Sequence, residues 1–276
     1  MDRAMMRSFH AIPCGEETLA ATVDTGSGTT ALLIVSGGNE IRSGAHNGMA
    51  SLAMQICEQG FPVLRYDRRG IGESSGENDG FLSSAADIAA AARFLRQEQQ
   101  IHKIIAFGNC DAATALALFG PEAGIDGYIL ANPWVIETSG EAEPDEPTMS
   151  SAAIRSRYWD RIKNPRTIID LLSGKINLKK LAKGLKQASR SDENSALSLR
   201  LASALSGLEQ DVQILLAKRD TTARAFLAAW NSADYETLRR EDKISTETLD
   251  SASHSFADAN AKNWLTGKLL DALRSA

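Results

Sequence analysis

The hydrophobic residues alternate between short continuous runs and longer stretches with helical spacing through the first half of the chain. Runs that are apolar on both faces are typical of buried parallel strands, and the intervening stretches predict helices that cover both faces of one sheet. The expected strands lie within 29–38, 61–76, 102–110 and 125–134, and the expected helices within 43–60, 81–98 and 111–120.

The pattern changes after residue 136. An acidic, proline-containing loop is expected at 137–148, and the spacing from about 150 to 205 is helical without a strand candidate. A strand is predicted at 210–220, followed by a helix near 222–232, a short last strand, a loop and a closing helix. The chain is therefore expected to be an α/β protein with a mostly parallel sheet and a helical cap inserted before the last strands. Its expected parts are a first core segment at 1–136, the cap at 137–207 and a second core segment at 208–276.

Composition narrows the classes of protein that fit this pattern. The 276 residues are 43% hydrophobic and 24% charged, as in ordinary soluble globular domains, and the net charge of −5 gives no reason to expect binding to nucleic acid. No apolar stretch is long enough for a transmembrane segment, and the N-terminal residues lack the core of a signal peptide, so we expect a cytoplasmic protein. Three cysteines without a CxxC pair favour neither a disulfide framework nor zinc, and we expect no metal and no cofactor.

One short motif carries a chemical hypothesis. Gly108-Asn109-Cys110-Asp111-Ala112 lies where an expected strand passes into an expected helix, and a nucleophile flanked by small residues at such a junction is the nucleophile elbow pattern. The N-terminus of the helix would favour a thiolate and would offer backbone N–H groups to an oxyanion. A small buried structural cysteine fits the same residues equally well, so the motif alone leaves both interpretations open.

Three further positions favour the nucleophile. Two glycines follow the first apolar run, where Gly38, or alternatively Asn39, would donate the second oxyanion N–H beside that of Asp111, although a plain turn also fits. Asp220 ends a late strand, as a triad acid or simply as a helix N-cap. His254 lies in the loop before the last helix. In enzymes with a nucleophile elbow, the nucleophile comes first along the chain, then the acid and then the base. Cys110, Asp220 and His254 follow the same order.

Other polar positions receive less specific expectations. His10 and His102 are expected at the surface, and His46 either lines the pocket or lies on a helix face. Asp67 and Arg69 are predicted to form a charged pair that fixes a glycine-rich loop. Two more residues, Ser84 and Asp87, are predicted to cap the helix that follows. The carboxylate of Asp111 either opposes the thiolate or caps its own helix and faces away.

Together, "YDRRGIGESSG", "GNCDA", Asp220 and His254 resemble the α/β-hydrolase superfamily over essentially the whole chain. More narrowly, "FGNCDAATAL", "SGGNEIRSGAHNG" and "AKRDTTARAF" resemble the first type of exosortase A system-associated hydrolases. These occur beside genes for exopolysaccharide production and protein sorting. The resemblance implies the α/β-hydrolase fold and a cytoplasmic hydrolase with a cysteine nucleophile. The chain is also similar to dienelactone hydrolase in the use of Cys with His and Asp. Cysteine in place of serine, and Ala112 in place of glycine, disfavour an ordinary lipase or esterase.

The expected cap is basic, since residues 151–190 contain 11 lysines and arginines against two aspartates, a net charge of +9. A solvated helix face accounts for this charge, and so does attraction of an anionic partner such as a carrier protein, coenzyme A or a membrane surface. The predicted function is hydrolysis of an ester or thioester that is a small molecule or is linked to a carrier. The alternatives are acyl transfer by the same triad and a catalytically silent binding module. A homodimer is compatible with the sequence.

Overall fold

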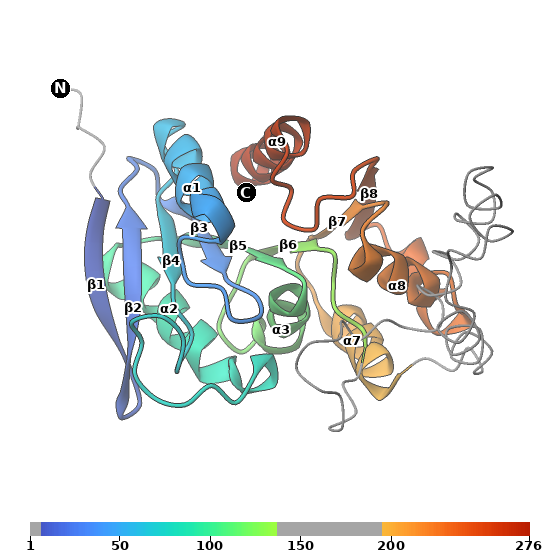
Figure 1. The fold of residues 1–276 in the computed structure, drawn as a ribbon, viewed down its shortest axis with the longest axis horizontal. Coiled ribbons are helices and arrows are strands. Elements are labelled where there is room, and N and C mark those ends of the chain that lie inside the picture. The colour runs from blue at the N-terminus through green and yellow to red at the C-terminus, as the bar shows by residue number, and fades with distance from the viewer. Residues whose placement is uncertain (1–6, 137–194) are drawn as a thin grey trace, which may run out of the picture.

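The computed structural model describes residues 7–136 and 195–276, which form an eight-stranded sheet with helices on both faces (Figure 1). The strand order is β1-β2-β4-β3-β5-β6-β7-β8, and only β2 runs opposite to the others. This is the mostly parallel α/β architecture expected from the hydrophobic pattern. The strands are β1 Arg7–Cys14, β2 Glu17–Asp24, β3 Thr30–Val35, β4 Val63–Tyr66, β5 Lys103–Asn109, β6 Gly127–Ala131, β7 Val212–Ala217 and β8 Ile244–Leu249.

The helices divide between the two faces of the sheet (Figure 1). Buried side chains of α1 and α9 pack on one face, and those of α2, α3, α7 and α8 pack on the other. Both faces of the central strands are therefore covered, which explains why their sequences are continuously apolar. The helices are α1 Gly48–Glu58, α2 Ala85–Glu98, α3 Asp111–Phe119, α7 Ala196–Gly207, α8 Thr221–Trp230 and α9 Ala259–Ser275, with short 3-10 helices at Ala45–Asn47, Phe81–Ser83, Ala233–Tyr235 and Leu238–Arg240.

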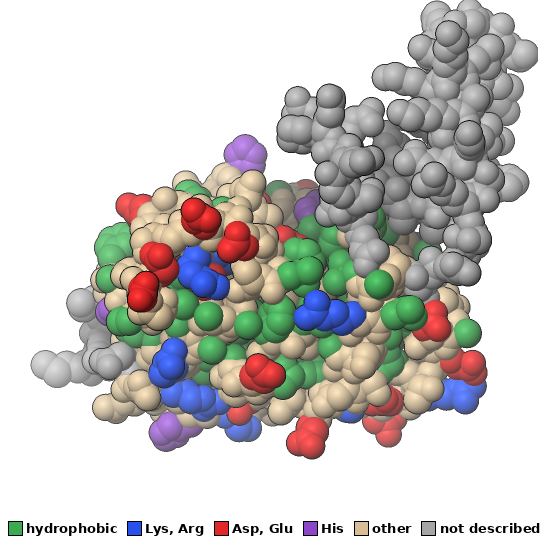
Figure 2. Space-filling view, turned by 90° about the horizontal axis from the view of Figure 1, so that it is seen from below, with side chains coloured by type: hydrophobic (Ala, Val, Ile, Leu, Met, Phe, Trp, Pro, Cys, Tyr) green, Lys and Arg blue, Asp and Glu red, His purple; other side chains and the backbone are tan. Residues whose placement is uncertain are grey.

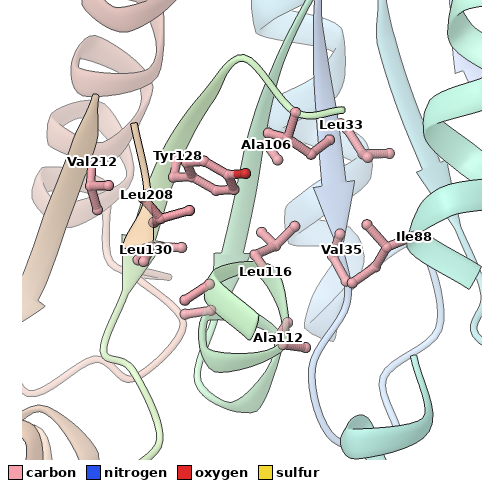
Figure 3. Packing of buried hydrophobic residues seen from close by; sticks show 14 of the residues in the cluster. Leu33, Val35, Ile88, Ala106, Ala112, Leu116, Tyr128, Leu130, Leu208 and Val212 are labelled. Atoms are coloured by element: carbon pink, nitrogen blue, oxygen red, sulfur yellow. The ribbon is translucent and has the colours of Figure 1, made fainter. Parts of the chain in front are cut away.

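Helix α3 lies at the centre of the larger hydrophobic cluster (Figure 3). Leu116 is fully buried and lies among side chains of β3, β5 and β6 in this cluster. The small residues Ala112, Ala113 and Ala115 let the helix approach the sheet closely, because they add little volume at the contact. The alanine-rich sequence after Cys110 thus holds the start of α3 tightly against the end of β5.

The first strand pair was not anticipated from the hydrophobic pattern. β1 and β2 form an antiparallel hairpin at the edge of the sheet, in register from Arg7 opposite Asp24 to Cys14 opposite Glu17. In β1, exposed or half-buried positions outnumber buried ones, so the strand lacks the continuous apolar run that marks the central strands. The alternation that an edge strand requires is a weaker signal in sequence.

Two of the predicted local contacts are wrong. Asp67 pairs with Arg42 rather than with Arg69, and Asp67 also accepts the backbone N–H groups of Arg42 and Glu73. Arg69 instead pairs with Asp87 at 2.5 Å. Asp87 therefore does not take part in a capping box, and the Ser84 side chain makes no capping hydrogen bond to the helix. Both acids are buried, and each pairs with a guanidinium from another segment of the chain.

Most of the predicted cap, including the basic stretch at 151–190, lies outside the described residues. The C-terminal part of the predicted insertion forms α7, whose buried Leu201 and Leu205 join the core cluster with α3. On the face seen in Figure 2, side chains of both charges surround a centre with many hydrophobic side chains. Among the helices of the described ranges, none has the length and apolar character needed to span a membrane.

Candidate functional site

Cys110 occupies the sharp turn between β5 and α3. Its backbone angles, φ 64° and ψ −126°, lie in a region that costs a non-glycine residue on the order of 1–3 kcal/mol. Hydrogen bonds hold the turn: the N–H of Cys110 donates to Ala131 at 2.9 Å, and its carbonyl accepts from Ala113 at 3.1 Å and Trp134 at 3.2 Å. The thiol is thus presented at the N-terminus of α3 by a strained turn that its neighbours impose.

Gly108 is required for this turn to form. A Cβ at this position would lie 2.8 Å from the backbone C and O atoms of Ala112 and 2.9 Å from the backbone N of Ala113. Real Cβ atoms do not approach backbone so closely, so β5 and α3 reach their observed separation only because residue 108 lacks a side chain. The small residues in the motif therefore serve the close approach that the sequence pattern predicted.

Asp220 and His254 come together beside this turn. The Nδ1 atom of His254 lies 3.1 Å from Oδ2 of Asp220. The same oxygen accepts the backbone N–H groups of Thr222 and Ala223, both at 3.0 Å, so Asp220 is also the N-cap of α8. Asp220 is therefore the helix N-cap considered from the sequence, and the same carboxylate, which is 7% exposed, contacts His254.

The electrostatics of this pair favour its charged form. Burial raises the pKa of Asp220, but hydrogen bonds from His254, Ala223 and Thr222 outweigh this effect and hold its pKa below the ordinary value. The hydrogen bond with Asp220, followed by one with Cys110, raises the pKa of His254 to about 10. The imidazole therefore binds both Asp220 and the Cys110 thiol and is protonated at neutral pH. One ring nitrogen, Nδ1, faces the acid, which leaves Nε2 for the sulfur.

The residues expected to form an oxyanion hole are arranged in an unexpected way. The backbone N–H of Gly38 donates to both carboxylate oxygens of Asp111, at 2.8 and 3.0 Å. Neither interpretation of Asp111 from the sequence describes this contact, which bridges the loop after β3 and the first residue of α3. The side-chain oxygen of Asn39, whose backbone N–H is the alternative donor, accepts a hydrogen bond from the Asn78 amide at 3.0 Å.

The remaining cysteines are poor candidates for chemistry. Cys14 and Cys57 are buried, whereas Cys110 is half-buried. Cys14 donates to Asp87 and Cys57 donates to the carbonyl of Thr25, and burial raises the pKa of both thiols. All three thiols are free. A reacting thiol must ionise and meet solvent, and only Cys110 has the exposure and the imidazole partner for this.

The other histidines lie elsewhere or have a different setting. His10 lies on the edge strand β1 and contacts Ser8 at 2.7 Å. His102 precedes β5, at the opposite end of the strand from Cys110, and is exposed. His46 lies in the 3-10 helix Ala45–Asn47 before α1, with a left-handed φ of 50°. Of these three, only His46 adjoins the segment that follows His254.

A cavity of about 90 Å³ lies between the start of α1 and the loop after His254. Within the described residues, His, Cys, Asp and Glu side chains form no group of three placed to hold a metal ion. Residues that line the cavity include Glu40, His46, Met49, Leu52, Phe256 and Lys262, whereas Cys110, Asp220 and His254 do not line it.

Two asparagines near the site were not singled out from the sequence. Asn109 and the fully buried Asn132 both donate to the backbone carbonyl of His254, each at 3.1 Å. A polar residue directly after the apolar run of β6 is the signal that could have drawn attention to Asn132. Strand ends at the same edge of a parallel sheet gather functional side chains. The apolar run of β6 by itself indicates only a buried strand.

The comparisons with known proteins are consistent with this geometry. The sequence profile of the family described as serine aminopeptidase, S33, matches residues 28–230. This range includes the β3 loop, the Cys110 turn and Asp220. Among curated protein sequences, none matches the chain.

Several solved structures share the fold over nearly the whole chain. The esterase Pf2001 from Pyrococcus furiosus superposes with a TM-score of 0.66 at 11% identity, covering 99% of this chain and 93% of that one. Est1E from Butyrivibrio proteoclasticus, bound to ferulic acid, gives a TM-score of 0.62 at 13% identity, covering 96% of this chain and 98% of that one. Dienelactone hydrolase from Anabaena variabilis gives 0.60 at 13% identity, covering 97% and 96%. At these identities the similarity establishes the α/β-hydrolase fold.

Proposed function

We propose, from the premise that this chain belongs to the family described as serine aminopeptidase, S33, that it hydrolyses an ester or thioester through Cys110, His254 and Asp220. The observation that supports this most strongly is the hydrogen-bonded series Asp220–His254–Cys110, which ends at a strained nucleophile turn. The description of the family names a serine enzyme. A cysteine at this position keeps the geometry of the nucleophile turn and replaces the serine hydroxyl by a thiol.

In the first half of the reaction, the Cys110 thiolate attacks the carbonyl carbon, and a C–S bond forms as the carbonyl π electrons move to oxygen. The imidazolium of His254 then gives its Nε2 proton to the departing alkoxide or thiolate as the C–O or C–S bond breaks. Asp220 holds Nδ1 and stabilises the charged ring throughout. The products are the free alcohol or thiol and an acyl-Cys110 thioester.

In the second half, neutral His254 removes a proton from water, and the hydroxide oxygen forms a bond to the acyl carbon. The C–S bond then breaks, which releases the acid and restores the Cys110 thiolate beside protonated His254. The backbone N–H groups of Gly38 and Asp111 are the proposed oxyanion donors, with Asn39 as the alternative. Because the Gly38 N–H donates to the Asp111 carboxylate, the substrate oxygen must displace that side chain. An alcohol or thiol in place of water would give acyl transfer by the same steps.

Thioesters and activated esters are the favoured substrate class, since a thiolate is both a good nucleophile and a good leaving group. The basic sequence at 151–190 supports a carrier-linked or anionic substrate, and the exosortase-associated resemblance supports a role in exopolysaccharide metabolism. These last two assignments rest on sequence alone.

Initial rates on a panel of acyl thioesters, aryl esters and aminoacyl arylamides test the proposal. We expect the wild type to turn over thioesters and esters, and Cys110→Ala and His254→Ala to reduce kcat/KM by a factor on the order of 10³ or more. The exposed Asn263→Asp variant is the control and should match the wild type. Turnover that survives in Cys110→Ala would exclude Cys110 as the nucleophile, and cleavage of arylamides alone would favour a peptidase.

A catalytically silent binding module is the second candidate, because the Asp111 carboxylate occupies the N–H of Gly38. The variant Asp111→Ala separates the two functions. A silent module would show no turnover in the wild type, and turnover only after Asp111 is removed. The hydrolase predicts turnover in both proteins.

A further inference from the structure

Asn132 has an unusual environment for an amide side chain. It follows β6 directly, is 0% exposed, and adopts a left-handed φ of 42°. Its backbone N–H donates to Leu215 of β7 at 2.9 Å, which anchors the residue to the neighbouring strand. A buried amide without partners is costly, and a non-glycine residue in this conformation adds strain, so the side chain must make compensating contacts.

Those contacts join three strand ends to the loop that carries His254. The side-chain oxygen of Asn132 accepts the N–H of Ala217, the last residue of β7, at 2.9 Å. Its amide nitrogen donates to Oδ1 of Asn109, the last residue of β5, at 3.0 Å, and to the carbonyl of His254 at 3.1 Å. Asn109 donates its own amide N–H to the same carbonyl at 3.1 Å. One backbone carbonyl therefore receives two amide donors.

The position of this carbonyl gives the contact its importance. Asn109 directly precedes Cys110, and Ala217 lies three residues before Asp220. The His254 side chain is 41% exposed, so packing alone does not fix the ring. Elsewhere in the loop, Ser251 and Ser253 make hydrogen bonds within the loop and to Asp258, and the Ser251 carbonyl accepts the N–H of Arg219 at 2.9 Å. The two asparagines are the side chains that tie the His254 backbone to the strand end that presents Cys110.

We propose that Asn132, together with Asn109, is a positioning residue that clamps the backbone of His254 so that its ring reaches both Asp220 and Cys110. The kinetic consequence of this clamp rests on the proposed function, whereas its effect on the His254 ring does not. Neither asparagine contacts the reacting atoms in this role. A purely structural role, by contrast, would affect stability and leave the ring's environment unchanged.

The test uses Asn132→Leu, which keeps the approximate volume and adds no charge. It removes the Asn132 N–H donors to His254 and Asn109 and the acceptor of the Ala217 N–H. Asn263→Leu, on the exposed face of α9, is the matched control. The titration of His254 is followed by NMR, and its resonance is assigned by its loss in His254→Gln. In the wild type we expect a pKa of about 10. In Asn132→Leu the pKa should fall toward the ordinary value of about 6.5, because the ring separates from Asp220 and Cys110.

Kinetics provide the second measurement. A misplacement of about 1 Å costs on the order of 100-fold in rate, so kcat should fall by about that factor in Asn132→Leu while KM changes little. If Asn132→Leu does not fold, Asn109→Leu removes one of the two donors at a half-buried site and should produce a smaller shift in the same direction. A folded variant with an unchanged His254 titration overturns the clamp. Failure of the wild type to hydrolyse any substrate overturns the proposed function, and the titration still decides the clamp.

Discussion

At the scale of single residues, the His254 imidazole is the group on which the proposed chemistry depends most. It binds a carboxylate through Nδ1 and a thiol on its other side, and both contacts favour the protonated ring. Two neighbours therefore stabilise the imidazolium form of His254.

The pH dependence of the reaction follows from the raised pKa of His254. We expect kcat/KM to hold its value through neutral pH and to fall as pH rises through about 10, because His254 then loses the proton that the leaving group needs. Rates measured with an aryl ester, with Cys110→Ala as the blank for alkaline hydrolysis, test this. Asp220→Asn should move the alkaline limb to lower pH. An alkaline limb near pH 6.5 in the wild type would contradict the account.

The raised pKa of His254 also makes the stability of the folded state depend on pH. The folded state holds the His254 proton more tightly than the unfolded state, so the stabilisation is complete below the ordinary pKa of about 6.5 and is lost as pH rises toward about 10. The lowered pKa of Asp220 acts at the other end, where its contribution is lost as pH falls below the ordinary value of 3.8.

At the scale of elements, the site depends on how closely α3 approaches β5. The motif predicted this approach from sequence, because only small residues fit beside a strained turn, and Gly108 and Ala112 occupy those positions. The contact between Asp111 and Gly38 could not be predicted in the same way, since it joins loops 73 residues apart in the chain. Its formation depends on the register of β3 beside β5, which is a property of the assembled sheet.

Two glycine substitutions with opposite expected signs test the element packing. Gly108→Ala places a methyl group against the backbone of α3 and should lower stability by about 1–3 kcal/mol and reduce activity, because the Cys110 turn must shift. Gly267→Ala, inside α9 with nothing within 4 Å of its Cβ, should raise stability by about 0.5–1 kcal/mol. Urea unfolding and initial rates measure both. A neutral Gly108→Ala would mean that β5 and α3 need no such close approach.

At the scale of the whole molecule, much of the architecture could be predicted because the central strands are buried on both faces. Continuous apolar runs and helical spacing indicated β3 to β8 and the helices between them. Strand β1 was not predicted, because an edge strand lacks that signal. The role of Asn132 could not be predicted either, because it depends on three strand ends and a distant loop that meet at one edge of the sheet.

Truncating a side chain at the centre of the larger hydrophobic cluster should destabilise the folded state, whereas truncating one at the protein surface should not. Leu116→Ala, at a fully buried position of α3, is expected to lower the free energy of unfolding by about 2–5 kcal/mol, because it removes buried methyl groups and leaves a cavity. Leu199→Ala, at a side chain on α7 that is 46% exposed, should change it by no more than about 0.5 kcal/mol. Equal effects of the two substitutions in chemical denaturation would contradict this view of the core.

The central claim is that Cys110 becomes covalently acylated, and intact mass spectrometry tests it most directly. The wild type, mixed briefly with a short acyl thioester and quenched in acid, should gain the mass of one acyl group less one hydrogen. Peptide mapping should locate the added group on Cys110, and the adduct should be absent from Cys110→Ala and slow to form in His254→Ala. Turnover by the wild type without any adduct, or an adduct that persists in Cys110→Ala, would contradict the account.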